Sequence, residues 1–406
     1  MSHAFSSPRS GHEVRLLQGS AEFFPALIEA VDGARREVRL ETYIFDFAGA
    51  AEAVAAALER AAERGVRVRV VVDGFGSRPP PVFWQHRLER AGVGWRVYAP
   101  LGWLGMLSLG SWRRLHRKLC VVDAEVAFCG GINILDDLRD PNYGVLPAPR
   151  FDFAVRVTGP LVAEAEASMT RLWWRMQAAR EIRRARLGVA LESLREAKVG
   201  RVRYVRPRTE VDTPRAKAAL LLRDNLRNRA GIERAYRRAI GRAREEIIIA
   251  NAYFVPGRKM RDALIAAARR GVKVRLLLQG RYEYFMQYYA ARPVYGALLR
   301  AGVQIHEYSA SFLHAKVAVI DGRWATVGSS NLDPLSLLLA REANVVVDDR
   351  PFAVQLHERL AQAIRESGRV MSADEYGNRP WRQRVMEHVA LGLMRLALMI
   401  QGKKYL

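Results

Sequence analysis

Two histidines and two lysines recur at one fixed spacing, and they are the residues of this chain best suited to chemistry. The first copy of the pattern runs from His116 to Asp123, and the second runs from His314 to Asp321. Each copy reads His-x-Lys, four apolar residues and Asp. Histidine can act as a nucleophile or a general acid, while lysine supplies a fixed positive charge. Two copies therefore suit phosphoryl transfer, in which one histidine attacks phosphorus and the other protonates the leaving oxygen.

Each copy is short, apolar and rich in Val or Ile, which indicates a buried strand. Side chains alternate between the two faces of a strand, so the histidine and the lysine share one face and the aspartate lies on the other. We therefore expect the two aspartates to be mainly structural members of the motif. The motif residues form the catalytic candidate set: His116, Lys118, Asp123, His314, Lys316 and Asp321.

Small residues and an asparagine follow each copy at matching offsets. If each hairpin loop is two residues long, pairing places each histidine opposite an asparagine and each lysine opposite Gly131 or Ser329. Asparagine amides and backbone N–H groups bind non-bridging phosphate oxygens, and small residues let the backbone approach a ligand. The expected substrate-binding residues are Asn133, Asn331, Gly131 and Ser329.

Composition and charge narrow the classes of partner. The chain has 406 residues, a net charge of +23 and 50% hydrophobic residues, which is enough for two ordinary domains with a basic surface. Such a surface favours polyanions, either nucleic acid or an anionic membrane. Cys120 and Cys129 would lie opposite each other in the first hairpin, and we expect them to be buried and reduced. No Cys/His spacing indicates zinc, no apolar run reaches transmembrane length, and the first 20 residues lack a signal peptide's apolar core.

The expected secondary structure also occurs twice, with an offset near 200 residues. Helices alternate with strands, which is typical of an α/β layered domain with much parallel pairing. Two halves facing each other across a pseudo-twofold axis would bring both histidines into one central cleft. The charged stretch from residue 180 to 230 reads as an interdomain helix and linker, with a DNA-binding surface as its alternative. The expected elements are helices at 21–36, 50–64, 232–242, 258–270 and 381–400, and strands at 14–17, 37–45, 66–72, 246–252 and 272–278.

Two carboxylates, Asp152 and Glu342, precede strand-like runs that follow the two hairpins. From the residues alone, a carboxylate at a strand edge is expected to pair with a nearby arginine. Four more residues correspond across the duplication and sit near strand ends, where they line the site or pack in the core. They are Glu41 with Asn251, and Tyr43 with Tyr253.

The doubled motif resembles the signature of the phospholipase D superfamily, His-x-Lys-x4-Asp with a trailing Gly-Gly/Ser-x-Asn. More closely, the chain is similar to bacterial class B cardiolipin synthases over most of residues 13–370, notably at 40–44, 116–133, 251–254 and 325–344. The resemblance implies an α/β fold of two similar α/β/α sandwich halves related by a pseudo-twofold axis, with a C-terminal amphipathic helix. The implied division is a first phospholipase D-like domain at 1–198, a second at 199–370 and a membrane-associating tail at 371–406.

The resemblance also implies roles and substrates. Asp152 and Glu342 would orient the histidines and raise their basicity. His116 would attack phosphatidylglycerol to form a phosphohistidine, and His314 would protonate the departing glycerol and deprotonate a second phosphatidylglycerol; exchanged roles fit equally well. A lipid-hydrolysing phospholipase D is the nearest alternative, a phosphodiesterase acting on nucleic acid comes next, and a non-catalytic membrane-binding protein is a different class. No cofactor, metal or nucleic-acid partner is expected, and the oligomeric state stays open.

Two apolar segments are candidates for contact with an anionic phospholipid membrane. Residues 98–112 are apolar and glycine-rich, contain no acidic residue and lead through two arginines to His116, which suits insertion into a lipid interface. An ordinary buried loop is the alternative. Residues 381–400 read as an in-plane amphipathic helix or as a helix docked on the core. With the resemblance, these segments imply a peripheral enzyme on the cytoplasmic face of the bacterial inner membrane.

Overall fold

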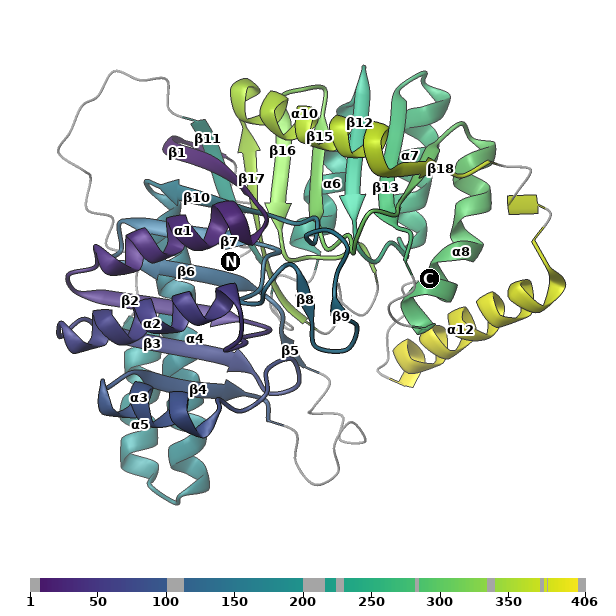
Figure 1. The fold of residues 1–406 in the computed structure, drawn as a ribbon. Coiled ribbons are helices and arrows are strands. Elements are labelled where there is room, and N and C mark those ends of the chain that lie inside the picture. Colours follow the sequence, from purple (N-terminus) through teal and green to yellow (C-terminus); the bar gives the residue numbers. More distant parts are fainter. Residues whose placement is uncertain are drawn as a thin grey trace.

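The computed structural model describes residues 8–100, 113–199, 216–223, 230–281, 285–333, 340–372, 376–377 and 379–400 (Figure 1). The greater part of the apolar segment 98–112, which was expected to contact a membrane, lies outside these ranges. The elements of the first half are β1 (Arg9–Gln18), α1 (Gly19–Asp32), β2 (Glu37–Thr42), α2 (Ala50–Glu63), β3 (Arg67–Asp73), α3 (Val82–Arg90), β4 (Gly94–Tyr98), β5 (Arg114–Leu115), β6 (Lys118–Val122), β7 (Val126–Gly130), β8 (Arg139–Asp140), β9 (Gly144–Val145), β10 (Phe153–Thr158), α4 (Leu161–Arg183) and α5 (Leu187–Val199).

The second half repeats this order with fewer additions. Its elements are β11 (Ala216–Arg223), α6 (Gly231–Arg242), β12 (Glu246–Asn251), α7 (Arg258–Arg269), β13 (Lys273–Gln279), α8 (Phe285–Arg300), β14 (Gln304–Tyr308), β15 (Lys316–Ile320), β16 (Trp324–Gly328), β17 (Ala340–Asp348), α10 (Arg350–Ser367), β18 (Gly368–Val370) and α12 (Trp381–Ile400). Among the described residues, no helix is both long enough and apolar enough to span a bilayer.

The strands of both halves form one continuous sheet. Its order is β4-β3-β2-β6-β7-β10-β1 in the first half, followed by β11-β17-β16-β15-β12-β13-β14-β18 in the second half. The second series mirrors the first, as a pseudo-twofold axis between β1 and β11 requires, so the predicted α/β fold of two similar halves is confirmed. Parallel pairing occurs in the outer strands, β2-β3-β4 and β12-β13-β14, and where the short strand β5 joins the start of β17, while the central ladders are antiparallel. Figure 1 shows the strands of the two halves crossing steeply, because the sheet twists.

The interpretation of residues 180–230 as helix and linker was only partly right. Helices α4 and α5 occupy its beginning, but Ala216–Arg223 forms the strand β11 at the centre of the sheet. This run alternates little and is mostly buried, because both of its faces are covered. The strand was not predicted from the sequence because its apolar run is short and is surrounded by arginines, and because it is stabilised by its neighbours in the sheet.

Helices cover the sheet in three groups, and one of them belongs to both halves. Helices α1, α2 and α3 pack on one face of the first half, and α6, α7 and α8 pack on the corresponding face of the second. Helices α4 and α10 pack on the opposite face, in a single apolar core to which strands of both halves contribute. Since burial of apolar surface is the main stabilising term in folding, this shared core holds the two halves in a fixed relation.

The motif hairpins contain three-residue loops, so the two-residue loop expected from the sequence was wrong. Val122 pairs with Val126, and Lys118 therefore pairs with Gly130 instead of Gly131. Asp123 and Ala124 adopt positive φ angles of 52° and 60°, a geometry that matches the twist of a tight hairpin. The second hairpin has the same form, with positive φ at Asp321 and Gly322.

The register also separates the two cysteines. Cys120 pairs with Phe128 and Cys129 pairs with Leu119, so the thiols lie on opposite faces of the sheet. Both are free and buried, as expected, although they do not lie opposite each other. Burial raises the pKa of both thiols to about 12, which keeps them protonated and unreactive.

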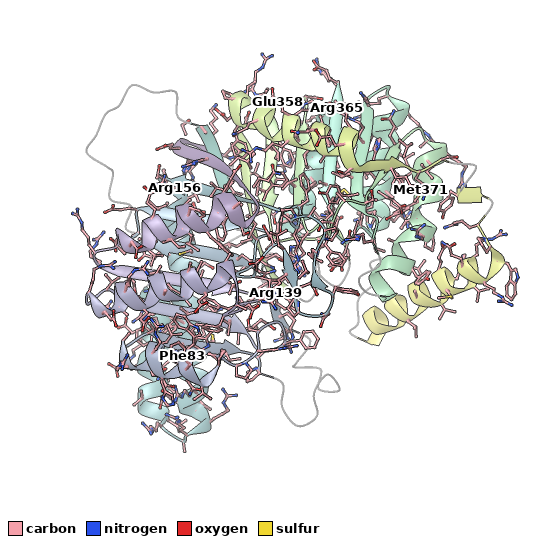
Figure 2. The ribbon with its side chains drawn as sticks, viewed as in Figure 1. Phe83, Arg139, Arg156, Glu358, Arg365 and Met371 are labelled. Carbon is pink, nitrogen blue, oxygen red and sulfur yellow. The ribbon has the colours of Figure 1, made fainter. Side chains whose placement is uncertain are left out.

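The longer segment between β7 and β10 reaches from the first half to the second. Ser311 Oγ donates to Ala148 O at 2.6 Å, and Phe151 bridges to Leu313. Arg139 of β8 accordingly lies where the two halves meet (Figure 2). The segment therefore places Asp152, which follows it, beside the second histidine motif.

Candidate active site

Each motif histidine is held through its backbone by the opposite half of the molecule. The N–H of His116 donates to Arg341 O at 3.0 Å, as β5 runs parallel to the start of β17. The N–H of His314 donates to Phe151 O at 2.9 Å, in the equivalent place before β10. Arg341 and Phe151 are the residues immediately before Glu342 and Asp152, so the backbone contact brings each carboxylate beside a histidine.

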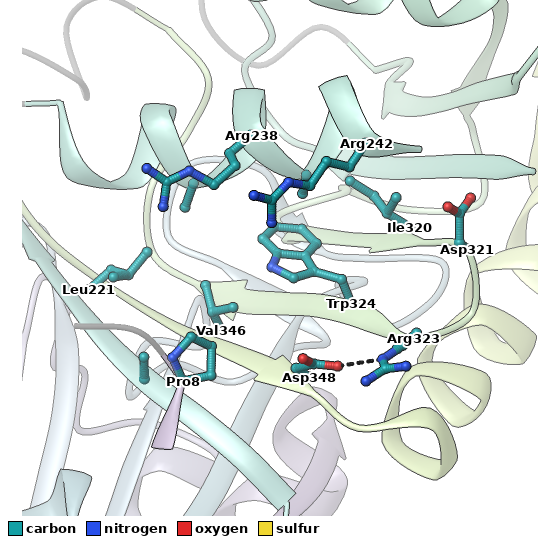
Figure 3. Close-up of a pocket in the computed structure, with 13 residues that line it drawn as sticks. Pro8, Leu221, Arg238, Arg242, Ile320, Asp321, Arg323, Trp324, Val346 and Asp348 are labelled. Atoms are coloured by element: carbon teal, nitrogen blue, oxygen red, sulfur yellow. Dashed lines mark hydrogen bonds and ion pairs between the residues drawn. The ribbon is translucent and has the colours of Figure 1, made fainter. Parts of the chain in front are cut away.

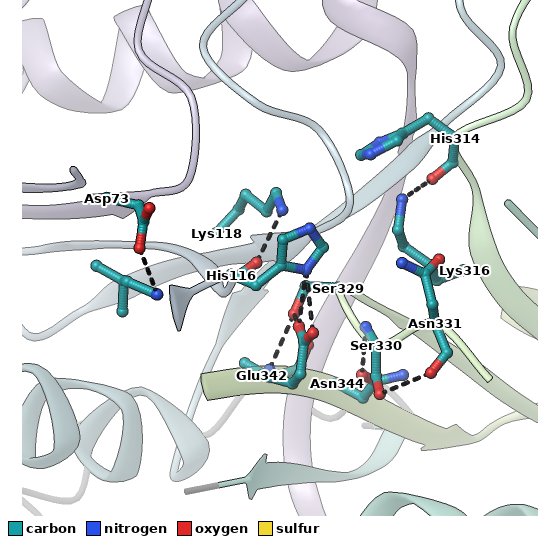
Figure 4. A network of polar contacts seen from close by, with 12 residues as sticks. Asp73, His116, Lys118, His314, Lys316, Ser329, Ser330, Asn331, Glu342 and Asn344 are labelled. Atoms are coloured by element: carbon teal, nitrogen blue, oxygen red, sulfur yellow. Dashed lines mark hydrogen bonds and ion pairs between the residues drawn. The ribbon is translucent and has the colours of Figure 1, made fainter. Parts of the chain in front are cut away.

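Each motif histidine is also held through its ring, by a carboxylate of the opposite half. His116 Nδ1 lies 3.0 and 3.2 Å from the two oxygens of Glu342, and His314 Nδ1 lies 2.6 Å from Asp152 Oδ2. A carboxylate accepts, so it fixes the proton on Nδ1 and leaves the lone pair on Nε2 for chemistry. The acids therefore occupy the place that the resemblance implied, and the geometry adds that each acid contacts the histidine of the other half. Figure 4 shows this contact for His116 and Glu342.

The two lysines supply the positive charge of the site. Lys118 is 5% exposed and Lys316 is fully buried, and each ammonium group donates to the carbonyl oxygen of its own motif histidine. Burial, together with the neighbouring Lys316 charge, lowers the pKa of Lys118 to about 7. Tyr43 completes this side of the site, with its ring centroid 4.9 Å from that of His116 and 5.4 Å from Lys118 Nζ.

Burial and the lysine charges keep both imidazoles neutral. Burial lowers the pKa of His116, although the Glu342 carboxylate works against that shift. Burial, with Lys316 and Lys118, lowers the pKa of His314 well below its usual value. Burial raises the pKa of Asp152 to about 7 in spite of the nearby lysines. The His314–Asp152 pair therefore exchanges a proton near neutral pH, whereas His116 presents an unprotonated Nε2.

The asparagines lie just beyond the hairpin strands. Asn133 Oδ1 accepts from the N–H of Ile44 at 3.1 Å, which fixes the orientation of its amide. Asn331 is 1% exposed, and the N–H of the next residue, Leu332, donates to Asn251 Oδ1 at 3.1 Å. Asn251 thus supports the loop that carries Asn331. Its counterpart Glu41 instead pairs with Arg117 in the core.

Gly131 and Ser329 contact the carboxylates, so their expected position opposite the lysines was wrong by one residue. Ser329 Oγ donates to Glu342 and accepts from the N–H of Ala343 at 3.0 Å. A Cβ atom at Gly131 would lie 2.2 Å from Asp152 Oδ1, so no side chain fits there. The three-residue loop causes the shift, and these two positions shape the partners of the histidines.

Asp123 and Asp321 lie outside the catalytic cluster, at the turn ends of their hairpins. Asp321 accepts from the N–H groups of residues 244, 245 and 246 at 2.9–3.0 Å, and Asp123 accepts likewise from residues 35, 36 and 37 at 2.8 Å. Figure 3 shows Asp321 on a surface pocket with Arg238, Arg242 and Trp324, and neither motif histidine lines this pocket. The structure therefore places both aspartates away from the histidines, where they join the hairpin to the start of a neighbouring strand. This position agrees with a structural role, and their place among the catalytic residues stays a prediction.

One buried ion pair was not foreseen as part of the site's support. Arg117, between His116 and Lys118, is 2% exposed and pairs with the Glu41 carboxylate, while its Nη1 donates to Ser168 Oγ at 2.8 Å. Its parity places it on the face opposite the histidine, where it ties β6 to β2 and α4. Within the described ranges, no group of three or more His, Cys, Asp or Glu side chains is arranged to hold a metal ion.

The fold and the site together define a protein of the phospholipase D-like class, with one His-x-Lys motif from each half in a shared site. The family described as "Cardiolipin synthase, PLD-like domain" matches residues 27–144 and 236–364, and the chain belongs to this family. Cardiolipin synthase B of Salmonella typhi is 37% identical over 382 residues, which cover 92% of this chain and 85% of the relative. Cardiolipin synthase B of Escherichia coli (strain K12) is 37% identical over 361 residues, covering 87% and 80%.

A more distant relative and one solved structure agree with this placement. Cardiolipin synthase A of Cronobacter sakazakii is 28% identical over 390 residues, which cover 93% of this chain and 74% of the relative. The crystal structure of phosphatidylserine synthase from Haemophilus influenzae superposes with a TM-score of 0.67 at 13% identity, covering 97% of each chain. At that identity the likeness concerns the fold alone.

Proposed function

We propose that this protein is a cardiolipin synthase, which transfers a phosphatidyl group from one phosphatidylglycerol to another and releases glycerol. The observation that carries the proposal is the pair of histidines in one site, each with Nδ1 on a carboxylate and each beside a lysine. Membership of the family and 37% identity to cardiolipin synthases B over most of the chain support the lipid substrate.

The reaction proceeds in two displacements at phosphorus. In the first, His116 Nε2 forms a bond to the donor phosphorus, the bond from phosphorus to the glycerol oxygen breaks, and the protonated His314–Asp152 pair gives a proton from His314 Nε2 to that oxygen. In the second, a hydroxyl of the acceptor phosphatidylglycerol loses its proton to His314 and attacks phosphorus, and the phosphorus–nitrogen bond breaks. Lys118, Lys316, Asn133 and Asn331 stabilise the negative charge on the phosphoryl oxygens in both steps.

The proton equilibria of the two histidine–acid pairs favour these roles. Burial raises the pKa of Asp152 to about 7, so its pair with His314 gains and loses a proton within the working range of a general acid and base. His116 contacts Glu342 through Nδ1, and burial lowers the pKa of His116. Its Nε2 is therefore unprotonated, as a nucleophile requires. Mass spectrometry of enzyme quenched in alkaline denaturant, in which a phosphorus–nitrogen bond survives, tests this assignment, since the phosphatidyl group should be found on His116 and not on His314.

The C-terminal helix supports a peripheral attachment to an anionic membrane. One side of α12 packs on α8 and buries Ala390 and Leu391. Another side leaves a row of apolar residues, spaced about one turn apart, exposed to solvent: Trp381, Val385, Val389 and Leu393. The helix is therefore both docked on the core and amphipathic. We infer that the exposed row lies in the headgroup region of the cytoplasmic leaflet, where the basic surface of the protein meets anionic lipid.

The first experiment uses the purified chain, phosphatidylglycerol vesicles and lipid analysis by mass spectrometry. Cardiolipin with free glycerol is expected from the wild type, and neither product is expected from His116→Ala or His314→Ala. His86→Ala, a change at an exposed histidine on α3, serves as the matched control and should keep full activity. Phosphatidic acid without cardiolipin would replace the transferase by a lipid hydrolase, and cleavage of single-stranded DNA alone would replace it by a nuclease.

A further inference from the structure

The residue before each motif histidine is held by a side chain that the mechanism has not used. The N–H of Leu115 donates to Asp73 Oδ2 at 2.7 Å, and the N–H of Leu313 donates to Gln279 Oε1 at 3.2 Å. Asp73 ends β3 and Gln279 ends β13, which are equivalent strands in the mirrored order of the sheet. Both halves thus hold the backbone N–H before the histidine with a side-chain oxygen, which comes from an aspartate in one half and a glutamine in the other.

These contacts complete a three-point attachment of each histidine. In the first half, the Leu115 N–H is held by Asp73, the His116 N–H by Arg341 O and the His116 ring by Glu342. In the second half, Gln279, Phe151 O and Asp152 hold the corresponding atoms. Leu115 and Leu313 are fully buried, so an N–H group left without its acceptor there would not be satisfied by water. The position of the imidazole depends on all three contacts.

The two acceptors differ because their surroundings differ. Asp73 is fully buried, and its second oxygen accepts from the N–H groups of Phe75 at 2.8 Å and Gly76 at 3.2 Å. Donors approach from both sides, and only a carboxylate offers an acceptor on each. Gln279 uses a single oxygen, which receives the Leu313 N–H and, at 3.4 Å, the Arg281 N–H. A neutral amide is sufficient in the second half.

The Asp73 carboxylate is also part of a buried ion pair. Arg114 Nη1 donates to Asp73 Oδ1 at 3.3 Å, and the Arg114 side chain is 12% exposed. Figure 4 shows Asp73 on the same side of the site as His116 and Lys118. Gln279 carries no charge, so the acceptor in the first half is an ion-paired carboxylate and the acceptor in the second half is a neutral amide.

We propose that Asp73 and Gln279 are positioning residues that fix His116 and His314 through the backbone of the preceding leucine. The proposal concerns residues outside the His-x-Lys motifs and outside the carboxylates that contact the imidazoles. It rests on the proposed function for its kinetic readout only, because the attachment of the histidines can be followed without substrate.

Gln279 offers the cleaner test, because it makes few other contacts. Gln279→Leu removes the acceptor at similar size, and kcat for cardiolipin formation should fall about 10- to 100-fold while KM changes less than about threefold, since a misplaced nucleophile or acid slows the chemical step. Gln279→Glu restores an acceptor and should recover most of kcat. Asp349→Ala is the matched control: it removes a side-chain acceptor for the Phe352 N–H at the start of α10 and should lower stability without changing kcat.

Asp73 is tested by two variants at one position. Asp73→Asn keeps one acceptor and should retain part of kcat, whereas Asp73→Leu removes both acceptors and should lower kcat at least as far as Gln279→Leu does. A kcat of Asp73→Leu equal to that of the wild type would overturn the role of Asp73.

A readout without turnover separates the proposal from the proposed function. With ¹⁵N-labelled histidine, the imidazole signals of wild-type His314 should report an Nδ1–H tautomer, and Gln279→Leu should shift or broaden these signals while those of His86 stay unchanged. If the wild type makes no lipid product but this change is seen, the proposed function fails and the positioning role stands. If Gln279→Leu leaves both kcat and the His314 signals unchanged, the positioning role is wrong.

Discussion

At the scale of single residues, the titration of Lys118 sets how the site binds anions. Burial beside Lys316 lowers its pKa to about 7, and only the protonated form attracts a phosphodiester. Above that pH the free enzyme must take up a proton to bind an anion, so affinity falls with rising pH by at most about tenfold per unit. Sulfate is a suitable probe because its charge is constant over this range.

We therefore expect the inhibition constant of sulfate to change little up to about pH 6 and to rise steadily between pH 7 and 9, as Lys118 loses its proton. Lys118→Met should bind sulfate more weakly and should lose most of this pH dependence. Competitive inhibition measured on the wild type and on this variant provides the check. A wild-type constant that stays flat up to pH 9 would show that Lys118 keeps an ordinary pKa.

At the scale of elements, the motif aspartates join each hairpin to the helix–strand connection next to it. Asp321 receives three backbone N–H groups that precede and begin β12, and Asp123 does the same before β2. Although burial works in the opposite direction, the three donors lower the pKa of Asp123, which shows that the charged form is the one that binds. Asp321→Ala should therefore lower the free energy of unfolding by about 1–3 kcal/mol, because the hydrogen bonds involve a charged acceptor.

Urea unfolding measures that loss, and the specific activity of the remaining folded protein should stay near the wild-type value. Asp348→Ala is a suitable comparison, because its ion pair with the exposed Arg323 contributes little. A loss of kcat in Asp321→Ala without a loss of stability would return the aspartate to the catalytic set.

Helix α12 is the second element with a separable task. Val389→Asp places a charge in its exposed apolar row and should weaken binding to phosphatidylglycerol vesicles several-fold, while turnover of a short-chain substrate below its aggregation concentration stays unchanged. Val354→Asp on α10 is the control, since Val354 is an exposed valine of another helix. Sedimentation with vesicles gives the measurement, and equal weakening in both variants would argue for a general charge effect.

At the scale of the whole molecule, the two halves form one catalytic unit because each supplies the acid for the other's histidine. Glu342 raises the pKa of His116 through its charge and its hydrogen bond, opposing the effect of burial. Glu342→Gln should therefore lower the pKa of His116 and change that of His314 much less. The histidine in the same half as Glu342, His314, would thus show the smaller change in pKa.

Titration of the histidine ring signals by NMR gives both values in one sample. Asp152→Asn is the reciprocal variant and should act mainly on His314. If Glu342→Gln changed the pKa of His314 more than that of His116, the contact of each acid with the histidine of the other half would not describe the protein in solution. The apolar core that α4 and α10 share maintains these contacts between each acid and the histidine of the other half, because it fixes the relative position of the halves.

The sequence predicted the chemistry more fully than the geometry. The two His-x-Lys motifs and their asparagines were identified from residue type and offset, and the α/β duplication followed from repeated apolar periods. The role of Asp152 and Glu342 was implied by the family resemblance. The errors were local: a hairpin loop one residue too short moved Gly131 and Ser329, and β11 was taken for a linker. Asp73 and Gln279 were missed because a polar residue at the end of an apolar strand carries no signal of its partner.

What the sequence alone determined is therefore the class of fold and the set of candidate reacting groups, since both depend on residue types that recur at fixed spacing. What only the tertiary structure decided is which acid serves which histidine and what holds each histidine in place. Those contacts join residues 226 positions apart, as at His116 and Glu342, or 162 positions apart, as at His314 and Asp152, or they link a side chain to a backbone N–H, as at Asp73 and Leu115. Spacing along the chain carries no record of such pairs, because they form only when the halves pack on their shared core.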